Sequence, residues 1–329
     1  RTINTSANTQ YYFFFFHLVY FPILIKNSMT SNQSHKALVF GSISIDKIVN
    51  RYGTYENVLG GSASYALLAT PKNTCQLIGV VGDDFPKEHF DFLGNHSNNL
   101  DDLTIEKGKT FIWGGEYQFD FSSRKTLYVD PGISEKYKPI LSDNSRNCDY
   151  LLLGNTLPRL QLMLLEQIES APFVILDTFK LYIDIANEDL KKAISKADLL
   201  CINYNEALAL SGLNNPTIKD MADCILQMGT KSLIIKKGEE GASFFNHEQY
   251  FSIGAYPVKR VMDTTGAGDS FVGGLLSAKM KGKNIQESMI CGATMASFCI
   301  EDISCRGLLS ISEDEYQIRE EWIKSSLTY

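Results

Sequence analysis

The chain has 329 residues, of which 44% are hydrophobic and 21% charged, so it has enough apolar material for one large or two medium-sized globular domains. Its formal net charge of −7 argues against a nucleic-acid-binding surface, which would need clusters of basic residues. The seven cysteines form no C-x-x-C pair, and most of them lie within apolar runs. We therefore expect reduced, buried thiols in a cytoplasmic protein, and no structural zinc site.

The first 36 residues differ in character from the rest of the chain. Residues 11–25, YYFFFFHLVYFPILI, form an uncharged apolar run that is short for a membrane span and contains Pro22. No small-residue cleavage site follows the run, and the first methionine is Met29. We expect residues 1–36 to be a disordered or artefactual extension, with Met29 as the natural start. A membrane anchor and a signal sequence are the alternatives.

From residue 37 onward, short apolar segments alternate with amphipathic ones. The apolar segments are KALVFGSIS, CQLIGVVG, YLLLGN, FVILDT, DLLCIN and SLIIKKG. This alternation predicts βαβ units in a mainly parallel central sheet with helices on both faces. Ligands of such folds bind at the carboxyl ends of the strands. The polar residues that close these predicted strands are Asp46, Asn155, Asp177 and Asn203.

Two stretches interrupt the alternation. Residues 47–58 and 110–129 are rich in aromatic and β-branched residues, and the second contains Gly-Gly and Ser-Ser turn signals. They predict a small β-sheet lid over one edge of the core, with ordinary surface hairpins as the alternative. No repeat or low-complexity linker follows residue 37. Residues 37–329 are therefore predicted to form one domain with a lid.

The string DTTGAGDSF, residues 263–271, carries the clearest chemical signal. Gly266, Ala267 and Gly268 allow a sharp turn that exposes successive backbone N–H groups at the start of a helix. Such a site suits an anion, above all the charge on a transferring phosphoryl group. Asp269, in the first turn of that helix, is placed to accept a proton from a substrate hydroxyl. Taken alone, the string also fits a capped surface turn.

The complete nine-residue string resembles the C-terminal signature of the PfkB (ribokinase-like) carbohydrate kinases. Further matches extend over residues 37 to about 310, namely GSISID, LGGSASYALLA, LIGVVGDDF, INYNEALAL and IIKKGEEGA. The resemblance implies a three-layer α/β ribokinase-like fold with a β-sheet lid. It also implies ATP-dependent phosphotransfer to a hydroxyl of a small sugar, polyol or nucleoside.

On the acceptor side, the resemblance implies that Asp46 binds substrate hydroxyls and that Gly60 and Gly61 form the lid hinge against the substrate. This chain departs from the family in the same motif. Tyr65 stands where the family usually has an asparagine that contacts sugar hydroxyls, and Ser62 replaces a lysine common in the ribokinase branch. Tyr65 therefore either shapes the substrate pocket or turns into the core, and the acceptor cannot be named from the sequence.

On the nucleotide side, Asn203 and Glu206 resemble the family's N-x-x-E arrangement around the Mg²⁺–phosphate network, with Glu206 in the outer shell of the metal. A helix N-cap with its capping partner is the alternative reading. Gly238 and Gly241 resemble glycines that approach the nucleotide. For Lys236 two readings stay open, a solvated charge and a contact to the nucleotide phosphates.

The implied cofactors are ATP and Mg²⁺, and Asp263 and Thr265 resemble residues that bind K⁺ beside the anion site in some family members. Two function classes stay open. One is a working kinase for a sugar or a nucleoside, and the other is a catalytically silent nucleotide- or sugar-binding regulator. No nucleic-acid or membrane partner is expected, and pairing of lid edges makes a homodimer plausible.

Overall fold

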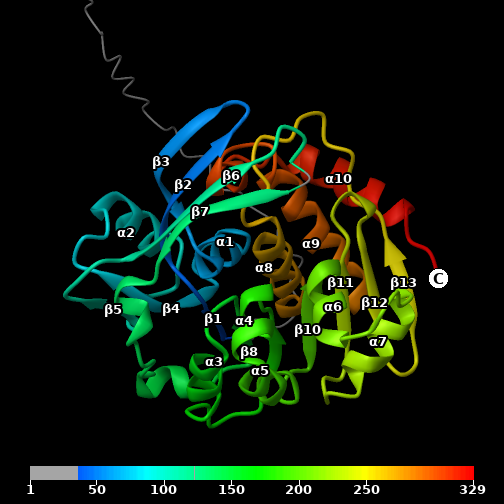
Figure 1. Ribbon diagram of the computed structural model, residues 1–329, viewed down its shortest axis with the longest axis horizontal. Helices are drawn as coiled ribbons and strands as arrows, with labels where there is room; N and C mark the ends of the chain where they lie inside the picture. Colours follow the sequence, from blue (N-terminus) through cyan, green and yellow to red (C-terminus); the bar gives the residue numbers. More distant parts are fainter. Residues whose placement is uncertain (1–35, 122) are drawn as a thin grey trace, which may run out of the picture. The chain divides into compact units, whose positions relative to one another are not determined.

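The computed structural model describes residues 36–329 except residue 122 (Figure 1). Within this part of the chain, a nine-stranded sheet has the order β13-β12-β11-β10-β9-β8-β1-β4-β5. All neighbouring pairs from β11 to β5 are parallel, whereas β12 pairs antiparallel with both β11 and β13. The strands are β1 (Ala37–Phe40), β4 (Cys75–Gly82), β5 (Leu103–Glu106), β8 (Tyr150–Leu153), β9 (Phe173–Leu176), β10 (Leu199–Asn203), β11 (Leu233–Lys236), β12 (Ala242–Phe245) and β13 (Tyr250–Ile253). The predicted mainly parallel sheet is confirmed.

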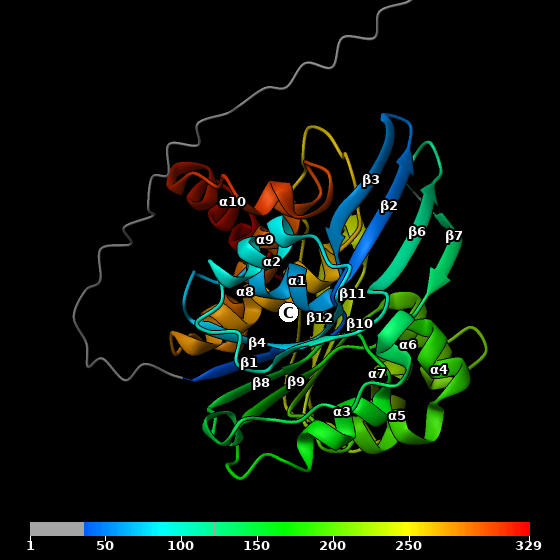
Figure 2. The ribbon, with the colours of Figure 1, turned by 90° about the vertical axis from the view of Figure 1, so that its left-hand side faces the viewer.

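Helices cover both faces of this sheet, because its central strands are apolar on both sides and both sides must be buried. One hydrophobic core contains side chains of α1 (Ser62–Leu68), α2 (Lys87–Gly94), α8 (Ala267–Met280), α9 (Ile285–Cys299) and α10 (Glu313–Ser325). The other contains side chains of α3 (Pro158–Leu165), α4 (Lys180–Ile185), α5 (Asn187–Ile194), α6 (Tyr204–Ser211) and α7 (Ile218–Leu226). Figure 2 shows these two helical layers on opposite sides of the sheet.

A second, four-stranded sheet has the order β3-β2-β6-β7. Its strands are β2 (Ser44–Asn50), β3 (Gly53–Gly60), β6 (Phe111–Tyr117) and β7 (Arg124–Asp130). They come from the two stretches that the sequence assigned to a separate small sheet, and that assignment is confirmed. The inner side of this sheet packs in a small core of its own, which contains Ile48, Val58, Tyr117 and Ile303.

The predicted first strand, which ran as far as Asp46, is wrong in its extent. Strand β1 ends at Phe40, and Asp46 lies on β2 in the small sheet. At the break, Gly41 packs closely against α1, because a Cβ on Gly41 would lie 2.4 Å from the Oγ atom of Ser62. The carbonyl of Ser42 instead accepts a hydrogen bond of 3.0 Å from the N–H of Ala63 at the start of α1. The chain therefore leaves the central sheet before Asp46.

The expectation for residues 1–36, including Met29 as the start, lies outside the described residues except for Lys36. The described residues belong to one compact unit. In the part of the chain that the structure describes, no helix is both long enough and apolar enough to cross a membrane. All seven cysteines are described, and all are free thiols, six of them buried.

Candidate active site

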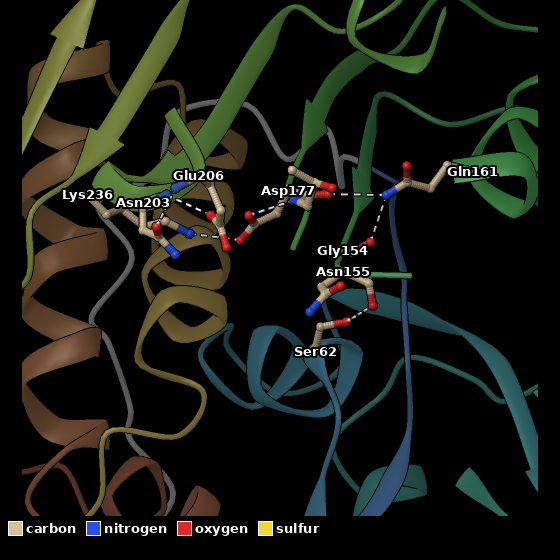
Figure 3. Close-up of polar contacts among 9 residues, drawn as sticks. Ser62, Gly154, Asn155, Gln161, Asp177, Asn203, Glu206 and Lys236 are labelled. Carbon is tan, nitrogen blue, oxygen red and sulfur yellow. Dashed lines mark hydrogen bonds and ion pairs between the residues drawn. The ribbon is translucent and has the colours of Figure 1, made fainter. Parts of the chain in front are cut away.

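Polar side chains from neighbouring strands meet at the carboxyl edge of the central sheet (Figure 3). Asp177 follows β9, and Lys236 closes β11. The Nζ atom of Lys236 lies 2.8 Å from Oδ2 of Asp177, and the two side chains are only 14% and 6% exposed. Burial lowers the pKa of Lys236, but the nearby Asp177, Cys201 and Glu206 together outweigh this effect and hold that pKa above its ordinary value. Lys236 is therefore a buried cation at the edge of the sheet rather than a solvated surface charge.

Asn203 and Glu206 form a capping box at the start of α6. The side chain of Asn203 accepts a hydrogen bond of 2.9 Å from the N–H of Glu206, and Glu206 accepts one of 2.8 Å from the N–H of Asn203. The capping reading of this pair is thus confirmed, and it leaves one oxygen of Glu206 available. Burial and the nearby Asp177 raise the pKa of Glu206 to about 7.

The start of α8 has the geometry of an anion site. Gly266 is its N-cap residue with φ 73°, and no side chain caps this helix. Within residues 36–329, residue 122 apart, no protein acceptor takes a hydrogen bond from the backbone N–H of Gly266 or Gly268. A Cβ on Gly268 would lie 3.1 Å from Nζ of Lys236, so the buried cation stands beside these N–H groups. Free donors, a helix N-terminus and a cation together favour an anion.

Asp269 lies in the first turn of α8, partly buried, and its carboxylate shares the site with three other charged groups. Burial and the carboxylate of Asp177 raise the pKa of Asp269 to about 6. Lys236 and Arg124 act in the opposite direction and lower it. The result is a carboxyl group that is mostly ionised at neutral pH but close enough to its pKa to take up a proton.

Asp46 approaches the same region from the small sheet. Its side chain is 4% exposed, and its Oδ1 atom accepts a hydrogen bond of 2.7 Å from the Ser44 hydroxyl. Burial raises the pKa of Asp46 to about 7, and the charges of Asp263 and Asp269 contribute. A Cβ on Gly60 would lie 2.0 Å from Oδ2 of Asp46, so the carboxylate rests directly on the glycine backbone.

Gly61 makes the turn from β3 into α1. Its φ of 93° lies in the region that L side chains rarely adopt, and a Cβ there would lie 2.3 Å from the carbonyl oxygen of Ser42. The side chain of Ser62, the next residue, donates a hydrogen bond of 3.0 Å to the carbonyl of Asn155 after β8. The amide oxygen of Asn155 is buried and has no partner among the described residues. The Gly-Gly turn thus brings the small sheet and the end of β8 together.

Of the two orientations that the sequence left open for Tyr65, the structure shows the buried one. The side chain is 1% exposed and belongs to the core under α1 and α8. Its ring lies directly below the anion site, because a Cβ on Gly266 would lie 2.2 Å from the ring. Tyr65 therefore supports the Gly266 backbone from the core side.

Asp263 and Thr265 lie together just before the anion site. Oδ1 of Asp263 accepts hydrogen bonds from the N–H and the hydroxyl of Thr265, at 2.9 and 2.6 Å. Oδ2 accepts one of 3.0 Å from the N–H of Ser304. Asp263 is fully buried, and burial raises its pKa. All three of these partners are neutral donors.

Gly238 and Gly241 lie in the turn between β11 and β12, next to Lys236. A Cβ on Gly238 would meet no atom within 4 Å, whereas one on Gly241 would lie 2.0 Å from the carbonyl oxygen of Ile253. Gly238 therefore faces open space beside Lys236, and Gly241 is required by close packing against the end of β13.

Sequence reasoning missed one charged residue of the site, Arg124 at the start of β7. Its guanidinium lies 5.0 Å from the ring centre of Trp113 in the small sheet and 5.5 Å from that of Phe179, which precedes α4. Its charge lowers the pKa of Asp46 and of Asp269. Arg124 thus bridges the small sheet and the core. Nothing in SSRKTL distinguishes it from a surface arginine.

The sequence matches the pfkB family of carbohydrate kinases over residues 34–311, which is most of the chain. This chain belongs to that family. As a pfkB kinase it transfers phosphate from ATP to a hydroxyl group of a sugar or nucleoside, as the sequence motifs predicted. In the structure, the carboxylate of Asp46 lies against the Gly60 backbone, and the charge of Asp269 raises the pKa of Asp46.

The relatives of this pfkB kinase are named after different phosphate acceptors. It is 26% identical to a cytidine kinase of Thermococcus kodakarensis over 79% of this chain and 94% of the relative. It is 28% identical to a ribokinase of Arabidopsis thaliana over 68% of this chain and 58% of the relative. Its fold matches that of a Burkholderia thailandensis nucleoside kinase in complex with inosine, with a TM-score of 0.70, 20% identity, and coverage of 87% and 97% of the two chains. The pfkB kinase fold is thereby established.

Proposed function

We propose that Asp269 is the general base of phosphotransfer and that Gly266, Ala267 and Gly268 form the anion hole for the transferring phosphoryl group. The observation that carries this proposal is that, within the described residues, the N–H groups of Gly266 and Gly268 are free beside the carboxyl group of Asp269. The N–H of Ala267 makes a long hydrogen bond of 3.4 Å to the carbonyl of Thr264. Phosphoryl transfer needs alignment and charge neutralisation more than a strong base. Asp269 orients the acceptor hydroxyl and takes its proton late, so a pKa of about 6 suits the role.

The acceptor is proposed to bind between Asp46 and Asp269, against the Gly60–Gly61 turn. The buried carboxylate of Asp46 accepts hydrogen bonds from acceptor hydroxyls, and the unpartnered amide oxygen of Asn155 lies where it accepts another. The small sheet closes over this pocket as a lid and excludes water, which limits wasteful hydrolysis of ATP. Tyr65 is buried in the core and contributes by holding Gly266 in place.

ATP is proposed to bind along the β10 and β11 ends, with Asn203, Gly238 and Gly241 around the nucleotide and Lys236 next to its phosphates. In the described residues, no group of three or more His, Cys, Asp or Glu side chains is placed to hold a metal ion. Glu206 and Asp177 would lie beside a Mg²⁺ ion that binds with the nucleotide, and such an ion would supply positive charge to neutralise the phosphates.

Further proposals concern the surroundings of this site. K⁺ is proposed to bind near Asp263 and Thr265, because a buried carboxylate with only neutral donors benefits from a nearby cation. A homodimer is proposed through the lid, where the edge strand β7 exposes Leu127, Tyr128 and Val129. Free thiols at all seven cysteines support a cytoplasmic location.

A panel of acceptors tests the proposed function. Wild-type protein with Mg²⁺ and ATP is expected to release ADP with at least one sugar, polyol or nucleoside from a broad panel. A comparison of the rate with ribose to the rates with cytidine and with inosine separates a sugar kinase from a nucleoside kinase. ATP binding without acceptor-stimulated ADP release across the whole panel would favour the silent regulator instead.

The rate of the reaction is expected to fall in acid as Asp269 becomes protonated. The base form exists above its pKa, so kcat/KM should decline below pH about 6. Lys236→Met removes a charge that lowers this pKa, and the decline should move to higher pH. Asp177→Asn removes a charge that raises it, and the decline should move to lower pH. Profiles of log kcat/KM against pH measure both shifts. Profiles that coincide for all three proteins would exclude Asp269 as the titrating base.

A further inference from the structure

The small sheet is hydrogen-bonded to the loop that leads into the anion site. Residues 262–265 precede Gly266, and strands on the small sheet reach them directly. On β2, the side-chain amide of Asn50 donates a hydrogen bond of 2.8 Å to the carbonyl of Met262. On β6, the Tyr117 hydroxyl lies 2.6 Å from the hydroxyl oxygen of Thr265. These contacts join residues that are far apart in sequence, and the second of them is buried on both sides.

The contact between Tyr117 and Thr265 has a defined direction. Thr265 has one hydroxyl proton, which it donates to Oδ1 of Asp263 at 2.6 Å. The Tyr117 hydroxyl must therefore be the donor in its bond to Thr265. The three groups form a buried chain from Tyr117 through Thr265 to the Asp263 carboxylate. Because these polar groups are away from water, loss of one bond leaves a partner unsatisfied.

The other oxygen of Asp263 connects to β3. It accepts the N–H of Ser304, a residue with φ 55°, which is unusual for a residue other than glycine. The Ser304 hydroxyl donates to the carbonyl of Leu59, which directly precedes Gly60 and Gly61 on β3. The Asp263 carboxylate thus links β6 and the base of β3, two parts of the same small sheet.

This arrangement fixes the peptide unit that precedes the anion site. The N–H and hydroxyl of Thr265 both bond to Asp263, and the carbonyl of Thr265 accepts a contact of 3.5 Å from the Cys299 thiol. The next residue is Gly266, which has a φ of 73° that glycine adopts without strain and which lies against the Tyr65 ring. The orientation of Thr265 therefore decides where the N–H groups of the anion site point.

We propose that Tyr117 is a positioning residue that couples the position of the lid to the geometry of the anion hole through Thr265 and Asp263. The proposal rests on the proposed function of residues 266–268. When the small sheet moves toward the core, the Tyr117 hydroxyl carries Thr265 into the orientation that aims the N–H groups at a phosphoryl group. By reciprocity, an anion bound at the N–H groups favours the closed position of the lid. An acceptor that closes the lid thereby completes the catalytic site.

A fluorescence experiment on the full chain tests this coupling without knowledge of the acceptor. The chain has two tryptophans, Trp113 on β6 and Trp322 on α10, so Trp322→Phe leaves only the tryptophan in the lid. Titration of this protein with AMP-PNP and Mg²⁺ is expected to change the emission of Trp113. Adding Tyr117→Phe should leave the Kd for AMP-PNP, measured by calorimetry, within about threefold but remove roughly half or more of the emission change.

Tyr128→Phe is the matched control, because it makes the same chemical change on the exposed edge strand of the same sheet. It should retain the full emission change. A full change in Tyr117→Phe at an unaltered Kd would overturn the coupling. Binding of AMP-PNP without any response of Trp113 in the Trp322→Phe protein would also overturn it and leave the proposed function intact. Failure of the wild-type protein to bind AMP-PNP would overturn the proposed function and the coupling together.

A double-variant comparison assigns the effect to the one hydrogen bond. Thr265→Val removes the acceptor of the Tyr117 hydroxyl, so it should reduce the emission change as well. The combination of Tyr117→Phe with Thr265→Val should reduce it no further than Thr265→Val alone. Once an acceptor has been identified, Tyr117→Phe should lower kcat roughly tenfold with little change in the KM for ATP. Additive losses in the double variant, or a rise in KM at constant kcat, would contradict a positioning role.

Discussion

Asp269→Asn is expected to lower kcat by roughly a hundredfold or more, the range typical of a positioned general base. The substitution keeps the size of the side chain but removes its ability to accept the proton of the acceptor hydroxyl. Initial rates of ADP release at saturating ATP and acceptor measure the loss. The Kd for ATP should change little, because the neighbouring N–H groups and Lys236 remain.

The same variant should also be more stable than wild-type protein at high pH. Burial raises the pKa of Asp269 to about 6, from 3.8, so the fold disfavours the ionised form. The stabilisation that the group contributes is present below its unfolded pKa and is lost as pH rises through about 6. Asp269→Asn removes this loss and should add about 1 kcal/mol at pH 8, given partial screening by water. The gain should disappear near pH 4.

Asp314→Asn is the control for the activity measurement, because Asp314 is an exposed acid in the first turn of α10. It should not change kcat. Near-normal phosphotransfer by Asp269→Asn with an identified acceptor would show that another group takes the proton.

Gly266→Ala is expected to lower kcat by roughly 10²- to 10³-fold, as loss of oxyanion-type donors does in other enzymes. Two effects combine at this position. Alanine is strained at φ 73°, and its Cβ would lie 2.2 Å from the buried ring of Tyr65. Since the Tyr65 ring is 1% exposed and enclosed by core side chains, the backbone must move instead. The N–H groups of residues 266 and 268 then lose their alignment.

Gly282→Ala separates these two effects. Gly282 also has φ 73°, but a Cβ there would meet no atom within 4 Å. Both variants should lose about 1 kcal/mol of stability from backbone strain, measured by urea unfolding, and Gly266→Ala should lose more because of its clash with Tyr65. Only Gly266→Ala should lose activity. A Gly266→Ala protein with kcat within about threefold of wild type would mean that these N–H groups do not stabilise the transferring phosphoryl group.

The main features of the fold were predictable because they depend on local patterns. Apolar strands such as YLLL and FVIL alternate with amphipathic helices, and this pattern identifies a covered parallel sheet. The aromatic stretches 47–58 and 110–129 likewise indicated a second sheet. The end of β1 differs from the prediction, and there Gly41 packs closely against Ser62, a contact between residues that are not adjacent in sequence.

Residues of the site could be predicted only where a continuous sequence motif determines the local backbone geometry. The anion-site glycines and Asp269 follow from one continuous string, and the capping reading of Asn203 and Glu206 follows from their spacing. The pairing of Lys236 with Asp177 and the approach of Arg124 depend on how distant strands meet. The inward orientation of Tyr65 depends on the core that surrounds it. Contacts of this kind are properties of the folded chain and leave no local pattern.

The most direct test of the central claim is acceptor-stimulated transfer of the γ-phosphoryl group. Wild-type protein and Asp269→Asn are incubated with radiolabelled ATP, Mg²⁺ and the best acceptor of the panel, and the phosphorylated acceptor is isolated and counted. We predict label in a phosphate ester of the acceptor with wild-type protein and roughly a hundredfold less with Asp269→Asn. Bound ATP with no labelled ester from any sugar, polyol or nucleoside would contradict the account.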